Sequence, residues 1–313
     1  WVEDPQDIIK TPGTESNVKE IYDACNELEK DSTNDIINQF SEYYNYAIHR
    51  AVTGPSFEKS FLEVKGDSDL QARFYVSASG SSGTLAAGDY LKDSLNAEIA
   101  VVEAAECPTL LYNGYGEHNI QGIGDKHVPL IHNVMNTDFV VGVSDQATNN
   151  LNLIFNTDIG QNYLKSRKGF DDNFIKRLPE FGLSSIANII ASIKLSKYMN
   201  LGPQDAIITV ATDGADLYLT ELEKTKKEFS GTYDETSCAE MYGQYLKGIA
   251  TDHTLELNQK EKERIFNLGY YTWVEQQGVD LNDFEKRRDQ QFWRDHYNHI
   301  LSLDDRIEEF NAL

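Results

Sequence analysis

The chain has 313 residues, 40% of them hydrophobic, which is enough for one large or two ordinary domains around a buried core. It carries 28 Lys and Arg residues against 51 Asp and Glu residues, a formal net charge of -23. A field of that sign repels polyphosphate backbones and anionic lipid surfaces. Composition therefore excludes a sequence-independent nucleic-acid binder and a protein held to membranes by charge.

Targeting and redox signals are sparse. No run of about 18 apolar residues occurs, and the first residues lack both the basic start and the apolar stretch of a signal peptide. We therefore expect a soluble, cytoplasmic protein without a membrane partner. Cys25, Cys107 and Cys238 are odd in number and lack Cys-x-x-Cys spacing, so we expect reduced thiols and neither a disulfide framework nor a structural zinc site.

The first 65 residues predict two helices and one strand. Thr14 is a cap candidate for an apolar stripe that begins at Val18 and predicts a helix to about Lys30. Residues 36–40 predict a short strand. Pro55 is suited to the first turn of a second helix, for which we expect a buried face made of Phe57, Phe61 and Val64.

Strand and helix patterns alternate between residues 72 and 211. Strands are expected at 72–77, 98–104, 138–143 and 206–211, and helices at 85–95, from Ser144 or Asp145 to Phe155, and from Ser184 to about Met199. Apolar strands separated by helices predict an α/β fold, with a mostly parallel sheet covered by helices on both faces. Ligands of such sheets bind at the carboxyl ends of the strands.

A small-residue loop, Ser79-Gly80-Ser81-Ser82-Gly83-Thr84, joins the first of these strands to the next helix. A helix start offers unpaired N–H groups and a positive dipole end, and glycines let the chain wrap closely around a phosphate. The same composition also suits a plain connection. The residues alone leave both interpretations open.

The last part of the chain differs in character. Lys and Glu dominate residues 221–228, and helical patterns follow with aromatic blocks at 266–278 and 292–293. Aromatic residues contribute large buried areas, so we expect a helical C-terminal extension over residues 221–313 that covers the domain or a partner subunit.

Five short motifs occur in one order between residues 38 and 145. They are Asn38-Gln39-Phe40, Thr53-Gly54-Pro55, Gly80-Ser81-Ser82-Gly83-Thr84, His118-Asn119-Ile120-Gln121-Gly122-Ile123-Gly124 and Val141-Gly142-Val143-Ser144-Asp145. Together they resemble the signatures of the cysteine synthase and cystathionine β-synthase group, the fold-type-II enzymes that use pyridoxal 5'-phosphate. The whole chain looks most like a bacterial branch labelled pyridoxal-phosphate-dependent β-subunit.

The resemblance implies a role for specific residues. Gly80, Ser81, Ser82, Gly83 and Thr84 match the loop that holds the cofactor phosphate. Gln39 matches a glutamine that helps to hold the substrate carboxylate, and Gly122 and Gly124 match a loop that lines the site. For each of these, a structural turn or a strand-end amide is the alternative. The implied division is residues 1–37 as the tail end of a smaller N-terminal domain, 38–220 as the large cofactor-binding domain, and 221–313 as the extension.

Two departures from the group's pattern stand out. Gly214 occupies the position of the serine that meets the pyridine nitrogen, so Thr212 or Asp213 is the expected substitute. The Schiff-base lysine, which in this group lies well before the Gln-Phe motif, has no match, and the catalytic residue is therefore unknown. The chain looks like the C-terminal two-thirds of such an enzyme.

The resemblance implies β-elimination or β-replacement on a small amino acid related to cysteine or serine, in a homodimer or in association with the enzyme's own N-terminal part. The alternative is a non-catalytic subunit or degenerate paralogue that keeps the fold for assembly. His118, His127 and His132 match no known ligand spacing, so no metal is expected. The elbow of a serine hydrolase and the Gly-x-Gly-x-x-Gly loop of a dinucleotide site are both missing.

Overall fold

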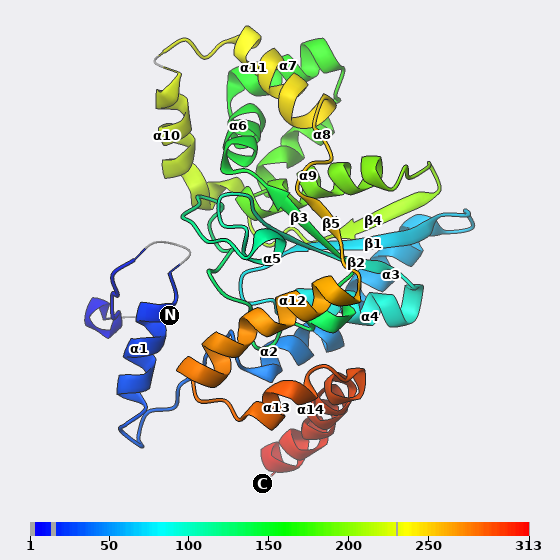
Figure 1. Cartoon of the computed structure of the whole chain (residues 1–313). Coiled ribbons are helices and arrows are strands. Elements are labelled where there is room, and N and C mark those ends of the chain that lie inside the picture. Colours follow the sequence, from blue (N-terminus) through cyan, green and yellow to red (C-terminus); the bar gives the residue numbers. More distant parts are fainter. Residues whose placement is uncertain (1–3, 14–16, 230, 313) are drawn as a thin grey trace.

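The computed structural model describes residues 4–13, 17–229 and 231–312. Within them, the sheet has five strands: β1 Gln71–Ala78, β2 Glu98–Ala104, β3 Phe139–Val143, β4 Asp205–Thr209 and β5 Thr254–Glu256. They lie in the order β4-β1-β2-β3-β5. Strands β1 to β4 are parallel, and β5 pairs antiparallel with β3. The predicted α/β fold with a mostly parallel sheet is confirmed (Figure 1).

Helices make up most of the rest. In chain order they begin with η1 Pro5–Asp7, α1 Lys19–Leu28, α2 Tyr43–Ile48, η2 His49–Thr53, α3 Gly54–Lys65, α4 Leu85–Leu95, α5 Thr109–Tyr112, η3 Val134–Asn136, α6 Asp145–Asn156, α7 Asp158–Lys168, α8 Asp172–Arg177, η4 Leu178–Glu180 and α9 Leu183–Tyr198. They continue with η5 Ala215–Tyr218, α10 Leu219–Glu228, α11 Glu235–Tyr242, η6 Gly243–Lys247, α12 Gln259–Tyr270, η7 Tyr271–Gln276, α13 Leu281–Lys286 and α14 Gln290–Asn311.

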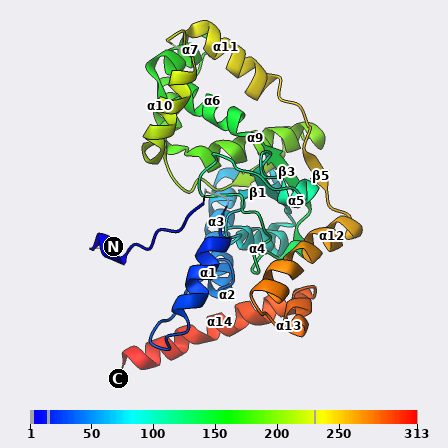
Figure 2. The same ribbon diagram turned by 60° about the vertical axis from the view of Figure 1, so that its left-hand side comes forward.

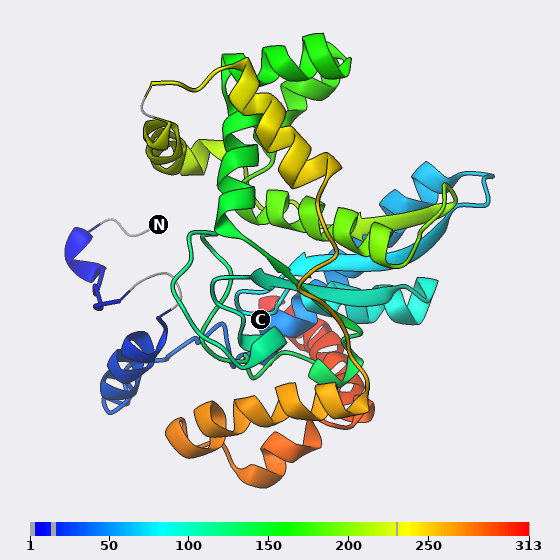
Figure 3. The same cartoon turned by 45° about the horizontal axis from the view of Figure 1, so that its top comes forward.

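Helices cover both faces of the sheet. On one face α4 contacts β1 and β2, and on the other α9 contacts β1 and β3. The alternation of side chains along β1 explains this, because Phe74 and Val76 join the core with α9 while Tyr75 packs with α4. In Figure 3 the helices α6, α7 and α11 lie beyond one side of the sheet, and α12 to α14 lie beyond the other.

The carboxyl ends of β1 and β4 meet at a change in winding direction. The chain runs from β1 to β2 and β3 on one side, and then returns to place β4 on the other side of β1. In open α/β sheets, a crevice forms outside the strand ends at such a point. The loop after β1 contains residues 79–84 and the loop after β4 contains residues 210–214, so topology brings both to this edge.

Several local predictions are wrong. Residues 36–40 form no strand, because the Asn38 side chain accepts the Phe40 N–H and makes a turn there. Val64 is 78% exposed, so that of the predicted face of this helix, Phe57, Phe61 and Val64, only Phe61 is buried. Helix α9 begins at Leu183 after Gly182, so Ser184 lies inside its first turn and is not its cap. Strand β4 is half-buried because it forms an edge of the sheet.

The C-terminal segment returns to the sheet. Strand β5, which the sequence patterns did not predict, adds an edge beside β3, and α12 to α14 then run below the sheet in the view of Figure 1. Figure 2 shows α14 extending away from this layer toward the side on which α1 lies. Of the helices in the described ranges, none combines the length and the apolar character that crossing a membrane requires.

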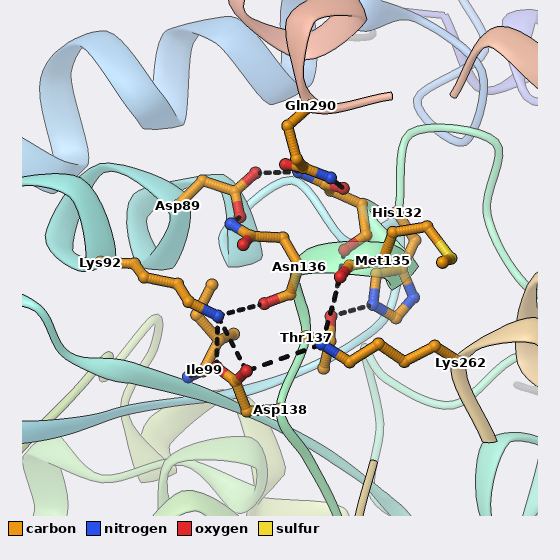
Figure 4. A network of polar contacts seen from close by, with 11 residues as sticks. Asp89, Lys92, Ile99, His132, Met135, Asn136, Thr137, Asp138, Lys262 and Gln290 are labelled. Carbon is orange, nitrogen blue, oxygen red and sulfur yellow. Dashed lines mark hydrogen bonds and ion pairs between the residues drawn. The ribbon is translucent and has the colours of Figure 1, made fainter. Parts of the chain in front are cut away.

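A buried polar network ties this C-terminal layer to α4 (Figure 4). Asp89 is 3% exposed, and its carboxylate accepts hydrogen bonds from Tyr46 Oη at 2.7 Å, Asn133 Nδ2 at 2.8 Å and Asn136 Nδ2 at 2.6 Å. Asn133 also exchanges two amide hydrogen bonds with Gln290, the first residue of α14. The network therefore connects α2, α4 and η3 with the last helix.

Candidate functional site

The loop after β1 has a compact internal structure. The hydroxyl groups of Ser79 and Ser82 lie 2.7 Å apart, and those of Ser77 and Thr84 lie 2.8 Å apart. Ser82 has φ 70°, a left-handed conformation that is unusual for a residue with a side chain. Helix α4 starts directly after Thr84, so the loop is wound around the helix N-terminus.

Five successive backbone N–H groups of this loop find no acceptor among the described residues. Within the part of the chain that the structure describes, the N–H groups of Gly80 through Thr84 donate to no backbone or side-chain oxygen, whereas those of Ser79 and Leu85 do. Unpaired N–H groups at a helix N-terminus attract anions, and the helix dipole adds to this attraction. The loop is therefore built to bind an anion such as a phosphate group.

Two glycines in the loop are required by close packing. A methyl group on Gly80 would lie 2.6 Å from the carbonyl oxygen of Gly122, and one on Gly83 would lie 2.2 Å from Asn45 Oδ1. Contacts shorter than 3.0 Å do not occur for real Cβ atoms. The loop thus packs directly against the 122–124 segment on one side and against α2 on the other.

A cavity of about 430 Å³ opens beside the loop. It is lined by Gly13, Asn17, Val18, Ile21, Gln39, Phe40, Gly80, Ser81, Gly122, Ile123 and Asp125. The structure therefore brings together four residues that the sequence singled out: Gly80, Ser81, Gln39 and Gly122. Ser82, Gly83 and Thr84 lie behind them, where the Ser82 and Thr84 hydroxyls are engaged with Ser79 and Ser77.

The 122–124 segment is held by its own turns. Gly122 and Gly124 have φ 81° and 74°, respectively, which glycine adopts without strain. The Gly124 N–H donates to the Ser79 carbonyl oxygen at 2.8 Å, and the Gly124 carbonyl oxygen lies 2.7 Å from His118 Nε2. Gly124 therefore fixes this segment against the phosphate-binding loop rather than lining the cavity itself.

The Val-Ser-Asp motif supports the same edge. Ser144 caps α6, since its Oγ accepts the Ala147 N–H at 3.2 Å. The Asp145 carboxylate accepts the N–H groups of Asn119 and Ile120. Burial raises the pKa of Asp145, and these hydrogen bonds act in the opposite direction. Asp145 thus anchors the beginning of the loop that leads to Gly122.

Thr212 and Asp213 do not line the cavity. The Thr212 hydroxyl lies 3.2 Å from Ser184 Oγ, and the Asp213 carboxylate accepts the hydroxyl of Tyr218. Asp213 Oδ1 is buried against Gly182 and has no hydrogen-bond partner among the residues described. The two side chains share the strand-end edge with the loop without joining its cavity.

An aromatic cluster lies next to the cavity. His127 Nε2 is 2.9 Å from the Tyr22 hydroxyl, and the rings of Phe40 and Trp273 contact the His127 ring. Burial lowers the pKa of His127 to about 4, so the ring is neutral at pH 7. His118 and His132 contact other groups, and no three His, Cys, Asp or Glu side chains in the described ranges are placed to hold a metal ion.

Sequence reasoning missed Asn45. This side chain lies on α2 and bridges Gln39 and Ser81, but it stands in an aromatic-rich stretch with no motif of its own. The only available signal was its position six residues after Gln39. The described residues that line the cavity include no lysine, the residue type that forms a Schiff base in the group of enzymes the motifs resemble.

Known proteins resemble the chain in sequence and in fold. No family model matches the chain. Cysteine synthase B of Campylobacter jejuni is 29% identical over 210 residues, which are 65% of this chain and 59% of that protein. The chain thus spans about three-fifths of the length of this curated relative.

Solved structures share the fold. The hydrogen sulfide-producing enzyme of Fusobacterium nucleatum is 23% identical and superposes with a TM-score of 0.52 over 76% of this chain and 62% of its own. Cysteine synthase of Entamoeba histolytica is 22% identical, with a TM-score of 0.53 over 75% of this chain and 62% of its own. The resemblance to cysteine synthases seen in the motifs is confirmed, and the chain shares its fold with these solved structures.

Proposed function

We propose that this chain forms the cofactor-binding part of a pyridoxal-phosphate enzyme that carries out β-elimination or β-replacement on a small amino acid. The observation that carries the proposal is the row of five N–H groups from Gly80 to Thr84, which have no acceptor in the described part of the chain and are wound around the start of α4, with Gly80 and Ser81 at the cavity wall. A phosphate dianion satisfies such donors, and the surrounding net charge of -23 makes an accidental anion site costly.

The residues present fit the cofactor. Gly80 and Gly83 leave the loop backbone uncovered, Ser81 adds a hydroxyl at the cavity wall, and about 430 Å³ is in the range of small-ligand pockets. When bound, pyridoxal phosphate supplies an electron sink that favours loss of the α-proton and of the β-substituent of an amino acid. Gln39 is proposed to hold the substrate carboxylate, and Gly122 to line the opposite wall.

Two assignments complete the proposal. Asp213, with Thr212 beside it, is the proposed partner of the pyridine nitrogen, because its segment follows β4 at the same strand-end edge as the loop and its Oδ1 has no partner among the described residues; reaching the ring requires that the carboxylate turn away from Gly182. Cysteine synthase B of Campylobacter jejuni extends beyond the region that this chain matches. The amine that holds the cofactor covalently is proposed to come from the part of the enzyme that corresponds to that region. We further propose a cytoplasmic homodimer, in which residues 221–313 contribute to the interface.

A direct binding test uses pyridoxamine 5'-phosphate, which has no aldehyde to react with surface lysines. We expect the chain to bind it at least tenfold more tightly than pyridoxamine, because the loop contacts only the phosphate group. Gly83→Ala is expected to weaken binding about tenfold, since its methyl group would collide with Asn45. Gly243→Ala is the matched control, because a methyl group there meets nothing within 4 Å.

Equal affinity for the two compounds would refute the phosphate site. A second measurement addresses catalysis: the intact mass of the native polypeptide together with its absorbance spectrum. A longer chain or companion peptide with a bound, absorbing cofactor supports the enzyme. A native polypeptide of this mass alone, without cofactor, supports the alternative of a non-catalytic subunit or degenerate paralogue.

A further inference from the structure

Asn45 connects two walls of the cavity through one side-chain amide. Its Nδ2 lies 2.9 Å from the carbonyl oxygen of Gln39 and 3.0 Å from Ser81 Oγ. Its Oδ1 faces Gly83 so closely that only glycine fits there. A single side chain on α2 therefore sets the spacing between the phosphate-binding loop and Gln39.

The chemistry of these partners fixes the direction of both hydrogen bonds. A carbonyl oxygen only accepts, so the nitrogen of the Asn45 amide must face Gln39. An amide nitrogen carries two hydrogens and no acceptor site, so the second hydrogen must go to Ser81 Oγ. Ser81 is therefore the acceptor in this pair, and its own hydroxyl proton is left for another partner.

Ser81 differs in this from the other hydroxyl groups around the loop. Ser79 pairs with Ser82 and Ser77 pairs with Thr84, and each pair uses one of its two hydroxyl protons, with either oxygen able to act as the donor. Ser81 has no further hydrogen-bond partner in the described part of the chain, and it lies on the cavity wall. Because Asn45 fixes Ser81 as an acceptor, the Ser81 proton points to no protein group described and is available as a donor to a ligand.

We propose that Asn45 is a positioning residue that holds Ser81 as an obligatory hydrogen-bond donor to the phosphate group in the loop. This inference rests on the proposed function, because it takes the anion to be the cofactor phosphate. Without Asn45, the Ser81 hydroxyl turns freely and can donate to solvent, so the preorganised donor is lost. The backbone N–H groups remain, and binding is weakened rather than abolished.

The test is a double-mutant cycle with pyridoxamine 5'-phosphate as the probe. A hydrogen bond to a charged group is worth roughly tenfold in affinity, so we expect Ser81→Ala to weaken binding about tenfold. Asn45→Ala should weaken it about three- to tenfold. The double variant should bind no more weakly than the weaker single variant, because both substitutions remove the same donor.

Two controls separate positioning from general damage. Pyridoxamine lacks the phosphate, so its weaker affinity should stay within twofold in every variant. Asn156→Ala also removes a helical asparagine whose amide makes two local hydrogen bonds, and we expect it to leave binding unchanged. Thermal unfolding of each variant reports whether it is folded, and Asn45→Ser, which has a small polar side chain, is the replacement if Asn45→Ala is unfolded.

The outcomes distinguish the two proposals. A wild-type chain that does not prefer the phosphorylated compound refutes the proposed function and this inference together. If the wild type does prefer it, unchanged affinity of the Asn45 variant refutes this inference alone. So does a double variant whose loss equals the product of the two single losses, since Asn45 then acts independently of Ser81.

Discussion

Replacing Asp89 is expected to destabilise the protein more than any surface substitution. In Asp89→Ala, the Tyr46 hydroxyl and the side-chain amides of Asn133 and Asn136 lose a common acceptor. Asp89 is 3% exposed, Tyr46 1% and Asn133 6%, whereas Asn136 is half-buried, so water does not readily replace the carboxylate for at least two of the three donors. The donors are then left buried and unsatisfied.

The magnitude follows from two opposing contributions. Three donors to one buried charge would each cost about 1–3 kcal/mol when left without a partner. Burial also raises the pKa of Asp89, so the folded protein bears the cost of desolvating this carboxylate. Asp89→Ala removes that cost, which offsets part of the loss. Losses of about 3–5 kcal/mol are typical when one partner of a buried charged network is removed. We expect that loss in the free energy of unfolding.

Urea unfolding followed by tryptophan fluorescence measures this effect, because Trp293 packs against Tyr46. Asp172→Ala is the matched control: its carboxylate pairs with Lys165 at the surface, and we expect a change below about 1 kcal/mol. Hydrogen exchange should also increase in α14, which the network reaches through Gln290. A loss below about 1 kcal/mol for Asp89→Ala would refute the reasoning that this network holds the C-terminal layer.

Two further predictions concern buried charges. Arg287 is 2% exposed, packs on the rings of Phe266 and Phe284, and has no carboxylate partner among the described residues. Burial lowers its pKa to about 10, so Arg287→Met should leave the free energy of unfolding unchanged or raise it by about 1–3 kcal/mol. A loss above about 2 kcal/mol in thermal or urea unfolding would contradict this. Burial raises the pKa of Glu103 from 4.5 to about 7 against the N–H groups of Leu110 and Leu111, so the native state keeps a proton that the unfolded chain has lost. Stability should fall by up to about 3 kcal/mol as pH rises from 4.5 to 7, and Glu103→Gln should flatten that slope; an unchanged slope would assign it to other groups.

The sequence by itself determined the fold class and the location of the anion loop. Apolar strands of five to eight residues, separated by helices, have few arrangements other than a covered parallel sheet, and a glycine-serine loop between strand and helix places N–H groups at a helix start. These features depend on neighbours in the chain, which a sequence pattern records. Resemblance then identified the ligand that such a loop takes in related enzymes.

Only the tertiary structure decided which side chains meet at the loop. Gln39, Asn45 and Ser81 come from separate segments, and their hydrogen bonds depend on how α2 packs against the start of α4. The edge strand β5 depends likewise on a partner that lies more than 100 residues earlier in the chain. Contacts between distant segments carry no periodicity, and so the sequence patterns could not reveal them.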